Sequence, residues 1–451
     1  MIKNDINSKS AGMIEAFGIL PIPNSERLSK SKDIFVIFFN ICINPGAILR
    51  SGLSVVAGLS FMQAVGVQVL GTLCGAFFCL IMAGIGCDYG VPGQVATRSA
   101  FGVRGSKIWC SLTRVLSSVY NFSFQNIVGC LSIHELIKTY FKYDLHFSII
   151  IAIFGVVQVF VGVVGYDLLK KLSFIFTPLK LAAMAYLAWN ILHLSPSGVV
   201  KTVPTLNFTV SCLLLLVTWV DVYLSVWLTL IPDAADFTRH SNNKKIIRIS
   251  ILLSVLCGSF IASSFGALGP VLLDQNNSNT ICLSLLGSPG IITLISVFFL
   301  VFADNLTINS LNIYTSGLSL CNVFSFLSRF QATILFGFLG ISFSFLGDML
   351  NDVVFFHKCI GSVVAPVSGV LLVDYLFIRK QFLSLDDLYM NSGPYWFTRG
   401  FNIIAMLWVF LGITFSISFP NLPFLPLVCI VLIGAGYAIT WKIFPSYWFK
   451  S

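Results

Sequence analysis

Charged residues are scarce in this chain. Asp, Glu, Lys and Arg make up only 10% of the 451 residues, whereas a soluble domain carries about 25%. Apolar residues reach 57%, and the mean hydropathy is +0.90. Because so few charges cannot cover the surface of a water-soluble protein of this length, lipid must be the solvent for most of it. The composition therefore predicts a membrane protein.

The sequence also lacks the patterns that carry chemistry. It contains no H-E-x-x-H, P-loop, G-x-S-x-G or paired-carboxylate pattern. The 12 cysteines include no C-x-x-C pair and the 5 histidines lie far apart, so neither residue type predicts a metal site or a disulfide framework. The polar N-terminus has no apolar core and does not predict a cleaved signal peptide. We expect no enzyme activity, no catalytic residue and no cofactor.

Apolar runs of roughly 20 residues, long enough to cross the hydrocarbon core of a bilayer, recur along the chain. About twelve are found, at 34–59, 62–86, 109–137, 146–166, 172–194, 209–232, 246–270, 289–320, 328–347, 353–378, 400–419 and 424–444. The sequence therefore predicts an all-α polytopic membrane protein of about 12 transmembrane helices.

The basic residues predict an orientation. With a cytoplasmic N-terminus, the termini and alternate loops hold most of the Lys and Arg, and the opposite side holds Lys138, Lys142 and Lys201. This asymmetry follows the positive-inside rule, so both termini are expected in the cytoplasm and the protein in the inner or plasma membrane. The net charge of +9 is then explained by the inner loops, and nucleic acid is not an expected partner.

The first predicted helix contains a break signal. Asn44, Pro45 and Gly46 lie within its apolar span, and Arg50 follows them. Pro45 lacks a backbone donor and Gly46 has no side chain to stiffen the turn. An unwound segment at this depth exposes carbonyl groups that can bind a cation; a simple proline kink is the alternative.

Three other predicted helices carry stripes of polar or aromatic residues at helical spacing. These are Ser117, Asn121 and Gln125 in the third helix, Trp219, Tyr223 and Trp227 in the sixth, and Asn305, Asn309 and Asn312 in the eighth. A carboxamide suits the amide-like edge of a nucleobase, and a flat aromatic ring can stack on a heterocycle. Helix packing and interhelical hydrogen bonding are the alternatives.

Four further segments resemble those of the nucleobase:cation symporter-1 family, which comprises cytosine, purine, uracil, allantoin, thiamine and hydantoin permeases. They are GVPGQVATRSAFGVRGS (90–106), DFTRH (236–240), APVSGVLLVDYLFIRK (365–380) and PYWFTRGFN (394–402). The last three are similar to the family patterns D-[FY]-x-R, P-x-x-G-x-x-x-x-D-Y and Y-W-x-x-x-G-x-N.

The resemblance implies a fold of two inverted five-helix repeats plus two C-terminal helices, with substrate and cation bound between the repeats. The predicted divisions are a cytoplasmic tail, two repeats, a helix pair and a second tail, at 1–33, 34–194, 209–378, 400–444 and 445–451.

The resemblance also implies site residues. Trp227 lies nine residues before Asp236, as the family's stacking aromatic does, and Gln125 and Asn312 match positions that bind the substrate. Asn121 stands where the family has a second Trp, so stacking on both ring faces would need another aromatic, such as Tyr120. Asn309 completes the expected substrate-binding set.

For the coupling ion the resemblance implies sodium ligands, and the sequence leaves an alternative open. Ala303 and Thr307 match two family ligand positions, and carbonyl groups near Ile41 and Asn44 would complete the shell. Leu306 replaces a further hydroxyl ligand. Proton coupling through an ion pair between Asp304 and Arg50 is the alternative; Arg50 could instead extend outward to the membrane surface.

These features predict a secondary transporter that imports a nucleobase or related heterocycle by alternating access, with cytosine or a purine as the first guess and Na⁺ or H⁺ as the coupling ion. Thiamine, allantoin and hydantoin are alternative substrates. A membrane enzyme or a sensor that binds without transporting are alternatives of other classes. The sequence does not predict the oligomeric state.

Overall fold

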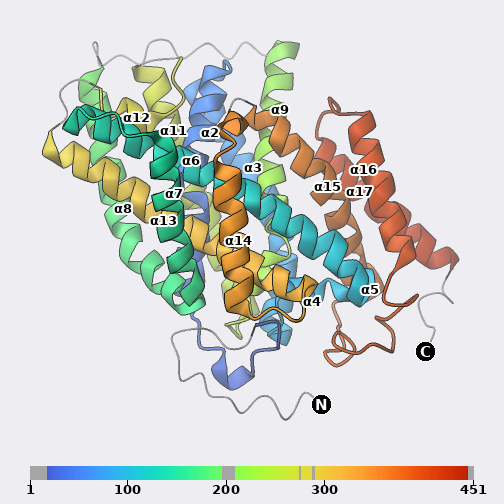
Figure 1. Ribbon diagram of the computed structural model, residues 1–451. Coiled ribbons are helices and arrows are strands. Elements are labelled where there is room, and N and C mark those ends of the chain that lie inside the picture. Colours follow the sequence, from blue (N-terminus) through green and yellow to red (C-terminus); the bar gives the residue numbers. More distant parts are fainter. Residues whose placement is uncertain (1–17, 196–208, 274–275, 287–289, 351, 445–451) are drawn as a thin grey trace.

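The computed structural model describes residues 18–195, 209–273, 276–286, 290–350 and 352–444. Within these ranges the chain is helical and forms no β-sheet (Figure 1). The α-helices are α1 (Ser31–Cys42), α2 (Pro45–Val56), α3 (Phe61–Tyr89), α4 (Gly93–Ala96), α5 (Arg98–Ser106), α6 (Thr113–Phe141), α7 (Phe147–Val164), α8 (Tyr166–Leu194), α9 (Val210–Leu228), α10 (Asp233–Thr238), α11 (Lys244–Leu272), α12 (Thr280–Leu283), α13 (Ile291–Val323), α14 (Arg329–Ser344), α15 (Val353–Val373), α16 (Ile403–Ser418) and α17 (Leu425–Ile443).

The long helices account for the predicted number of membrane crossings. In the described part of the chain, eight helices are long and apolar enough to cross a bilayer, and α1 with α2 forms a ninth, bent span. Three more helices complete about twelve: α6 has 29 residues but a polar face, and α14 and α16 have 16 residues each. The predicted fold class is confirmed. Most of the two predicted tails, 1–17 and 445–451, lies outside the described residues.

Local sequence sets the ends of these helices. α3 begins at Ser60, whose hydroxyl accepts from the N–H of Gln63 while the Gln63 side chain accepts from the N–H of Ser60. This reciprocal pair satisfies two donors that a helix start leaves free. The same helix ends at Gly90, which takes a left-handed conformation with φ +69°, a geometry that glycine adopts without steric cost.

Helices from the two halves of the chain pack against each other throughout the bundle. α1, α2 and α3 lie against α11, α3 also lies against α9, and α6, α7 and α8 lie against α13. The last two helices, α16 and α17, pack on α15 at one side of the bundle (Figure 1). The repeat boundaries at 194 and 209 remain a prediction, and the segment 196–208 between them lies outside the described residues.

The four family-like segments contact one another. The backbone N–H of Gly93 donates to the Asp236 carboxylate at 2.7 Å, and the Asn402 amide donates to the carbonyl of Ala100 at 2.6 Å. Arg379 ion-pairs with Asp374, within the third segment. The residues joined by these contacts therefore build the framework, and Phe237 is the one residue of the four segments that lines the cavity described below.

Candidate functional site

The predicted break in the first membrane span is present, and the side chain of Asn44 bridges the two helices on either side of it. α1 ends at Cys42, α2 begins at Pro45, and the two helices meet at an angle of 43°. The side-chain oxygen of Asn44 accepts from the N–H of Ala47 at 2.8 Å, and its nitrogen donates to the carbonyl of Ile41 at 2.7 Å. Asn44 thus caps α2. Its side-chain nitrogen also donates to the carbonyl of Ile41, which was expected to bind a cation.

α6 reaches this break through Gln125. The side-chain oxygen of Gln125 accepts from the N–H of Gly46 at 2.8 Å, and its nitrogen donates to Asn44 at 2.6 Å. A β-carbon on Gly46 would lie 2.6 Å from the Phe124 ring and 2.7 Å from the Gln125 amide. The absence of a side chain at Gly46 therefore allows α6 to approach the start of α2.

A cavity lies beside this break, and we call it the central cavity. It is lined by Ile41, Asn44, Ala47, Arg50, Gln68, Thr72, Arg114, Asn121, Gln125, Tyr223, Val226, Trp227, Thr229, Leu230, Phe237, Ile308, Leu311 and Asn312. Its empty volume is about 650 Å³.

Most of the predicted site residues meet at the central cavity. Four of the five predicted substrate residues, Trp227, Gln125, Asn312 and Asn121, belong to its lining. The lining also includes Ile41, Asn44 and Arg50, which were expected to serve the coupling ion. Asn309, Ala303, Thr307 and Asp304 are not among the lining residues.

The aromatic stripe on α9 turns two of its three rings to the cavity. Trp227 and Tyr223 line it, whereas Trp219 does not and packs beside Tyr223 in an apolar cluster, with ring centroids 6.2 Å apart. Gly75 of α3 lies against Trp227, because a β-carbon there would come within 2.3 Å of the Trp227 side chain. Tyr120 does not replace the second tryptophan: it stacks on Phe356 outside the cavity lining, with ring centroids 5.3 Å apart.

The carboxamide stripe on α13 is arranged in two layers. Asn312 faces the cavity, and its nitrogen donates to the side-chain oxygen of Asn309 at 3.1 Å. Asn309 in turn donates to Gln158 of α7 at 2.5 Å and to the carbonyl of Phe122 at 3.2 Å. Asn309 thus orients Asn312 from behind, and Gln158, which the sequence did not single out, anchors it.

The expected ion pair between Asp304 and Arg50 is not formed. Asp304 pairs with Lys180 of α8, and the Lys180 ammonium also donates to Asn40 and, at 3.5 Å, to Thr307. Lys180 is 1% exposed and Asp304 is fully buried. The Thr307 hydroxyl donates to the carbonyls of Ala303 and Asp304, at 3.0 and 2.9 Å. A lysine ammonium therefore lies beside the hydroxyl that was expected to bind sodium.

Arg50 does not extend to the membrane surface. It is 4% exposed and lies in α2, one turn after the break. Its guanidinium carbon lies 5.5 Å from the centre of the Phe124 ring. Its Nε and Nη1 atoms have no hydrogen-bond partner among the described residues.

A second arginine in the lining is paired. Arg114 of α6 forms an ion pair of 2.5 Å with Asp233 of α10 and donates to the Thr315 hydroxyl at 2.9 Å. Neither Arg114 nor Asp233 was singled out from the sequence, although Arg114 lies within the predicted span 109–137 and Asp233 directly follows the span 209–232.

Comparison with known proteins agrees with this geometry. The family of permeases for cytosine/purines, uracil, thiamine and allantoin matches residues 21–443. This chain belongs to that family. It is 25% identical over 376 residues to a hydantoin permease of Microbacterium maritypicum, covering 80% of this chain and 76% of that protein. It is 24% identical over 403 residues to a cytosine permease of Escherichia coli K12, covering 87% of each.

The fold of this permease is similar to that of a solved transporter. Mhp1, a nucleobase-cation-symport-1 family transporter, in a closed conformation with bromovinylhydantoin bound, superimposes with a TM-score of 0.80 at 20% identity, covering 96% of this chain and 97% of that chain. A sodium-coupled sialic acid symporter superimposes with a TM-score of 0.61 at 10% identity, covering 94% and 91%. The expectation that the chain is a permease and not an enzyme is confirmed.

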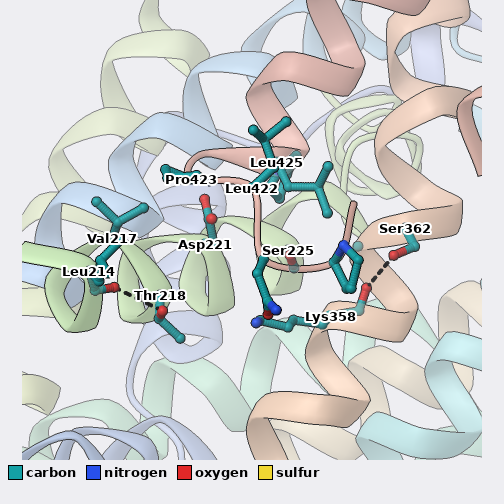
Figure 2. Close-up of a pocket in the computed structure, with 14 residues that line it drawn as sticks. Leu214, Val217, Thr218, Asp221, Ser225, Lys358, Ser362, Leu422, Pro423 and Leu425 are labelled. Atoms are coloured by element: carbon teal, nitrogen blue, oxygen red, sulfur yellow. Dashed lines mark hydrogen bonds between the residues drawn. The ribbon is translucent and has the colours of Figure 1, made fainter. Parts of the chain in front are cut away.

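The permease has a second cavity, between α9, α15 and the loop that joins α16 to α17 (Figure 2). Its empty volume is about 770 Å³, and Asp221 and Lys358 both line it. The hydroxyls of Thr218 and Ser362 donate to carbonyls of their own helices, at 2.9 and 2.8 Å. None of the predicted site residues lines this cavity, so the central cavity is the better candidate despite its smaller volume.

Proposed function

We propose that this permease moves a small planar heterocycle of the nucleobase or hydantoin type through the central cavity. The observation that carries the proposal is the convergence of Trp227, Asn312 and Gln125 on one cavity beside the helix break. Trp227 supplies a flat ring for stacking, and Asn312 supplies donors and an acceptor for an amide edge. Cytosine and purines fit this description, as do hydantoin and allantoin.

The charge of the lining argues against thiamine. Arg50 and Arg114 line the central cavity, and no Asp or Glu is found among its described lining residues. Thiamine carries a positive ring, which would meet the guanidinium of Arg50, whereas the charge of Arg114 is offset by Asp233. Because like charges repel strongly where water is excluded, a neutral or anionic heterocycle suits the cavity better.

The coupling ion in this proposal is a proton rather than sodium. Lys180 places an ammonium group against Asp304, Asn40 and Thr307, so a sodium ion at Thr307 would lie beside an existing positive charge. Leu306 also offers no oxygen where a ligand was expected. An intramembrane Lys–Asp pair, in contrast, contains two groups that can each bind and release a proton. Such a pair can therefore carry a proton from one side of the membrane to the other during the transport cycle.

Uptake and counterflow into proteoliposomes would test this function. Liposomes preloaded with unlabelled cytosine, hypoxanthine or hydantoin should take up the labelled compound faster than empty ones, and the Trp227→Ala variant should lose most of this exchange. A sensor would bind the compound without exchange. Binding without counterflow would therefore contradict transport, and the absence of both would contradict the proposed substrate class.

A further inference from the structure

Arg50 is an uncompensated charge in the central cavity. The two other cations buried around the site have carboxylate partners: Arg114 pairs with Asp233, and Lys180 pairs with Asp304. Arg50 has no carboxylate within ion-pair distance among the described residues, and two of its three guanidinium nitrogens have no acceptor there. It is 4% exposed, so bulk water does not solvate it fully.

The neighbours of Arg50 do not neutralise it. The Phe124 ring, 5.5 Å away, offers only a cation–π contact, which is weaker than an ion pair. The ionisable groups that interact with Arg50 electrostatically are the phenols of Tyr223 and Tyr120 and the imidazole of His357, and none of these side chains is an anion at physiological pH. Because a buried charge is costly unless it is paired and hydrogen-bonded, an anionic partner would stabilise the guanidinium of Arg50.

The position of Arg50 favours delivery of that anion by the ligand. Arg50 belongs to α2, whose N-terminal residues Asn44 and Ala47 also line the cavity. The N-terminus of a helix carries a partial positive charge, which adds to that of the guanidinium. A guanidinium presents its N–H groups as a fork that matches a carboxylate.

We propose that Arg50 selects a heterocycle that carries a negative charge, either a carboxylate or an ionised ring oxygen. The inference rests on the proposed function and narrows its substrate class. In the complex the ring stacks on Trp227, the amide edge meets Asn312, and the anionic group pairs with Arg50. A neutral imide can accept from the same fork but leaves the charge uncompensated, so it should bind less tightly.

Matched pairs of compounds test this assignment directly. Affinities of the purified full chain would be measured by calorimetry for uracil against orotate, which differ by one carboxylate, and for hydantoin against hydantoin-5-acetate. The wild type should bind the anionic member of a pair at least tenfold more tightly, a difference of about 1.4 kcal/mol. Arg50→Gln should abolish that preference, because binding of the anionic member should weaken about tenfold more than binding of the neutral member.

Two further variants separate selection from folding. Arg50→Lys keeps the charge and should retain part of the anion preference, whereas Trp227→Ala should weaken both members of a pair alike. Tighter binding of the neutral members by the wild type, or an anion preference that survives in Arg50→Gln, would overturn the inference and leave the proposed function intact. Failure of every member to bind would overturn both.

Discussion

Gln125 and Gly46 are joined by a hydrogen bond of 2.8 Å from the backbone N–H of Gly46 to the side-chain oxygen of Gln125. This bond satisfies a donor at the start of α2 that no intrahelical acceptor could take. A side chain thus holds the two parts of the broken span in place, and the cavity beside the break depends on it.

Replacement of Gln125 should therefore affect both stability and binding. In Gln125→Leu the N–H of Gly46 loses its acceptor and the side-chain oxygen of Asn44 loses one of its two donors, and we expect a loss of about 1–3 kcal/mol in the free energy of unfolding. Gln125→Glu keeps the acceptor for Gly46 and should lose less. Denaturant unfolding in detergent and calorimetric binding would measure the two effects; unchanged stability in Gln125→Leu would contradict this role.

The two tryptophans of α9 provide a matched pair of variants. Trp227 lines the central cavity and Trp219, two turns earlier, does not, although both are 3% exposed. Trp227→Ala should weaken binding of the heterocycle by about 1–3 kcal/mol, as expected for the loss of ring stacking. Trp219→Ala should lower stability to a similar extent and leave affinity unchanged. Equal losses of affinity in the two variants would argue against stacking.

Asn312 and Asn309 should differ in how their loss affects transport. Asn312→Ala removes a group that lines the central cavity, and affinity for the heterocycle should fall by about 1–3 kcal/mol. Asn309→Ala leaves Asn312 in place but removes its acceptor and the partner of Gln158. We expect a smaller loss of affinity together with lower stability. Concentration-dependent uptake and thermal unfolding would separate the two, and a larger loss of affinity in Asn309→Ala would reverse the assignment.

The Lys180–Asp304 pair makes the coupling ion testable. Either single change, Lys180→Met or Asp304→Leu, leaves a buried charge unpaired and should destabilise the protein by about 3–5 kcal/mol. The double variant removes both charges and should recover much of that stability. It should still exchange labelled for unlabelled substrate, yet no longer accumulate substrate when the external pH is lowered.

Two controls accompany that experiment. Lys171→Gln, at an exposed lysine of the same helix α8, should leave accumulation unchanged. Replacement of external sodium by choline should also leave wild-type uptake unchanged. A rise of uptake with sodium at fixed pH would favour the sodium alternative that the family resemblance implied.

Much of the architecture was predictable because its signals are local. The bilayer demands long apolar runs, and these gave about twelve helices close to their observed positions. Asn44, Pro45 and Gly46 indicated the break, since a missing donor and a missing side chain weaken a helix wherever it packs. Trp227 and Asn312, which line the central cavity, were singled out from spacing together with the family resemblance.

The pairing of charged groups was not predictable in the same way. Helical spacing tells which residues share a face, but it does not tell which helix that face meets. Asp304 was therefore assigned to Arg50, whereas α8 brings Lys180 to it. In the sequence, Lys180 gave only a weak signal, as a single cation in the apolar run 172–194. Gln158 was not singled out from the sequence, and its burial in α7 is known from the structure alone.

The charge of Arg50 also decides how the membrane voltage would act on this permease. A charge that crosses the membrane gains or loses about 2.3 kcal/mol for each 100 mV. If one anion held by Arg50 travels with one proton, no net charge moves, and the voltage neither drives nor opposes uptake. If a neutral ring travels with a proton, the voltage adds to the driving force. The unpaired guanidinium of Arg50 thus links the choice of substrate to the electrical balance of the transport cycle.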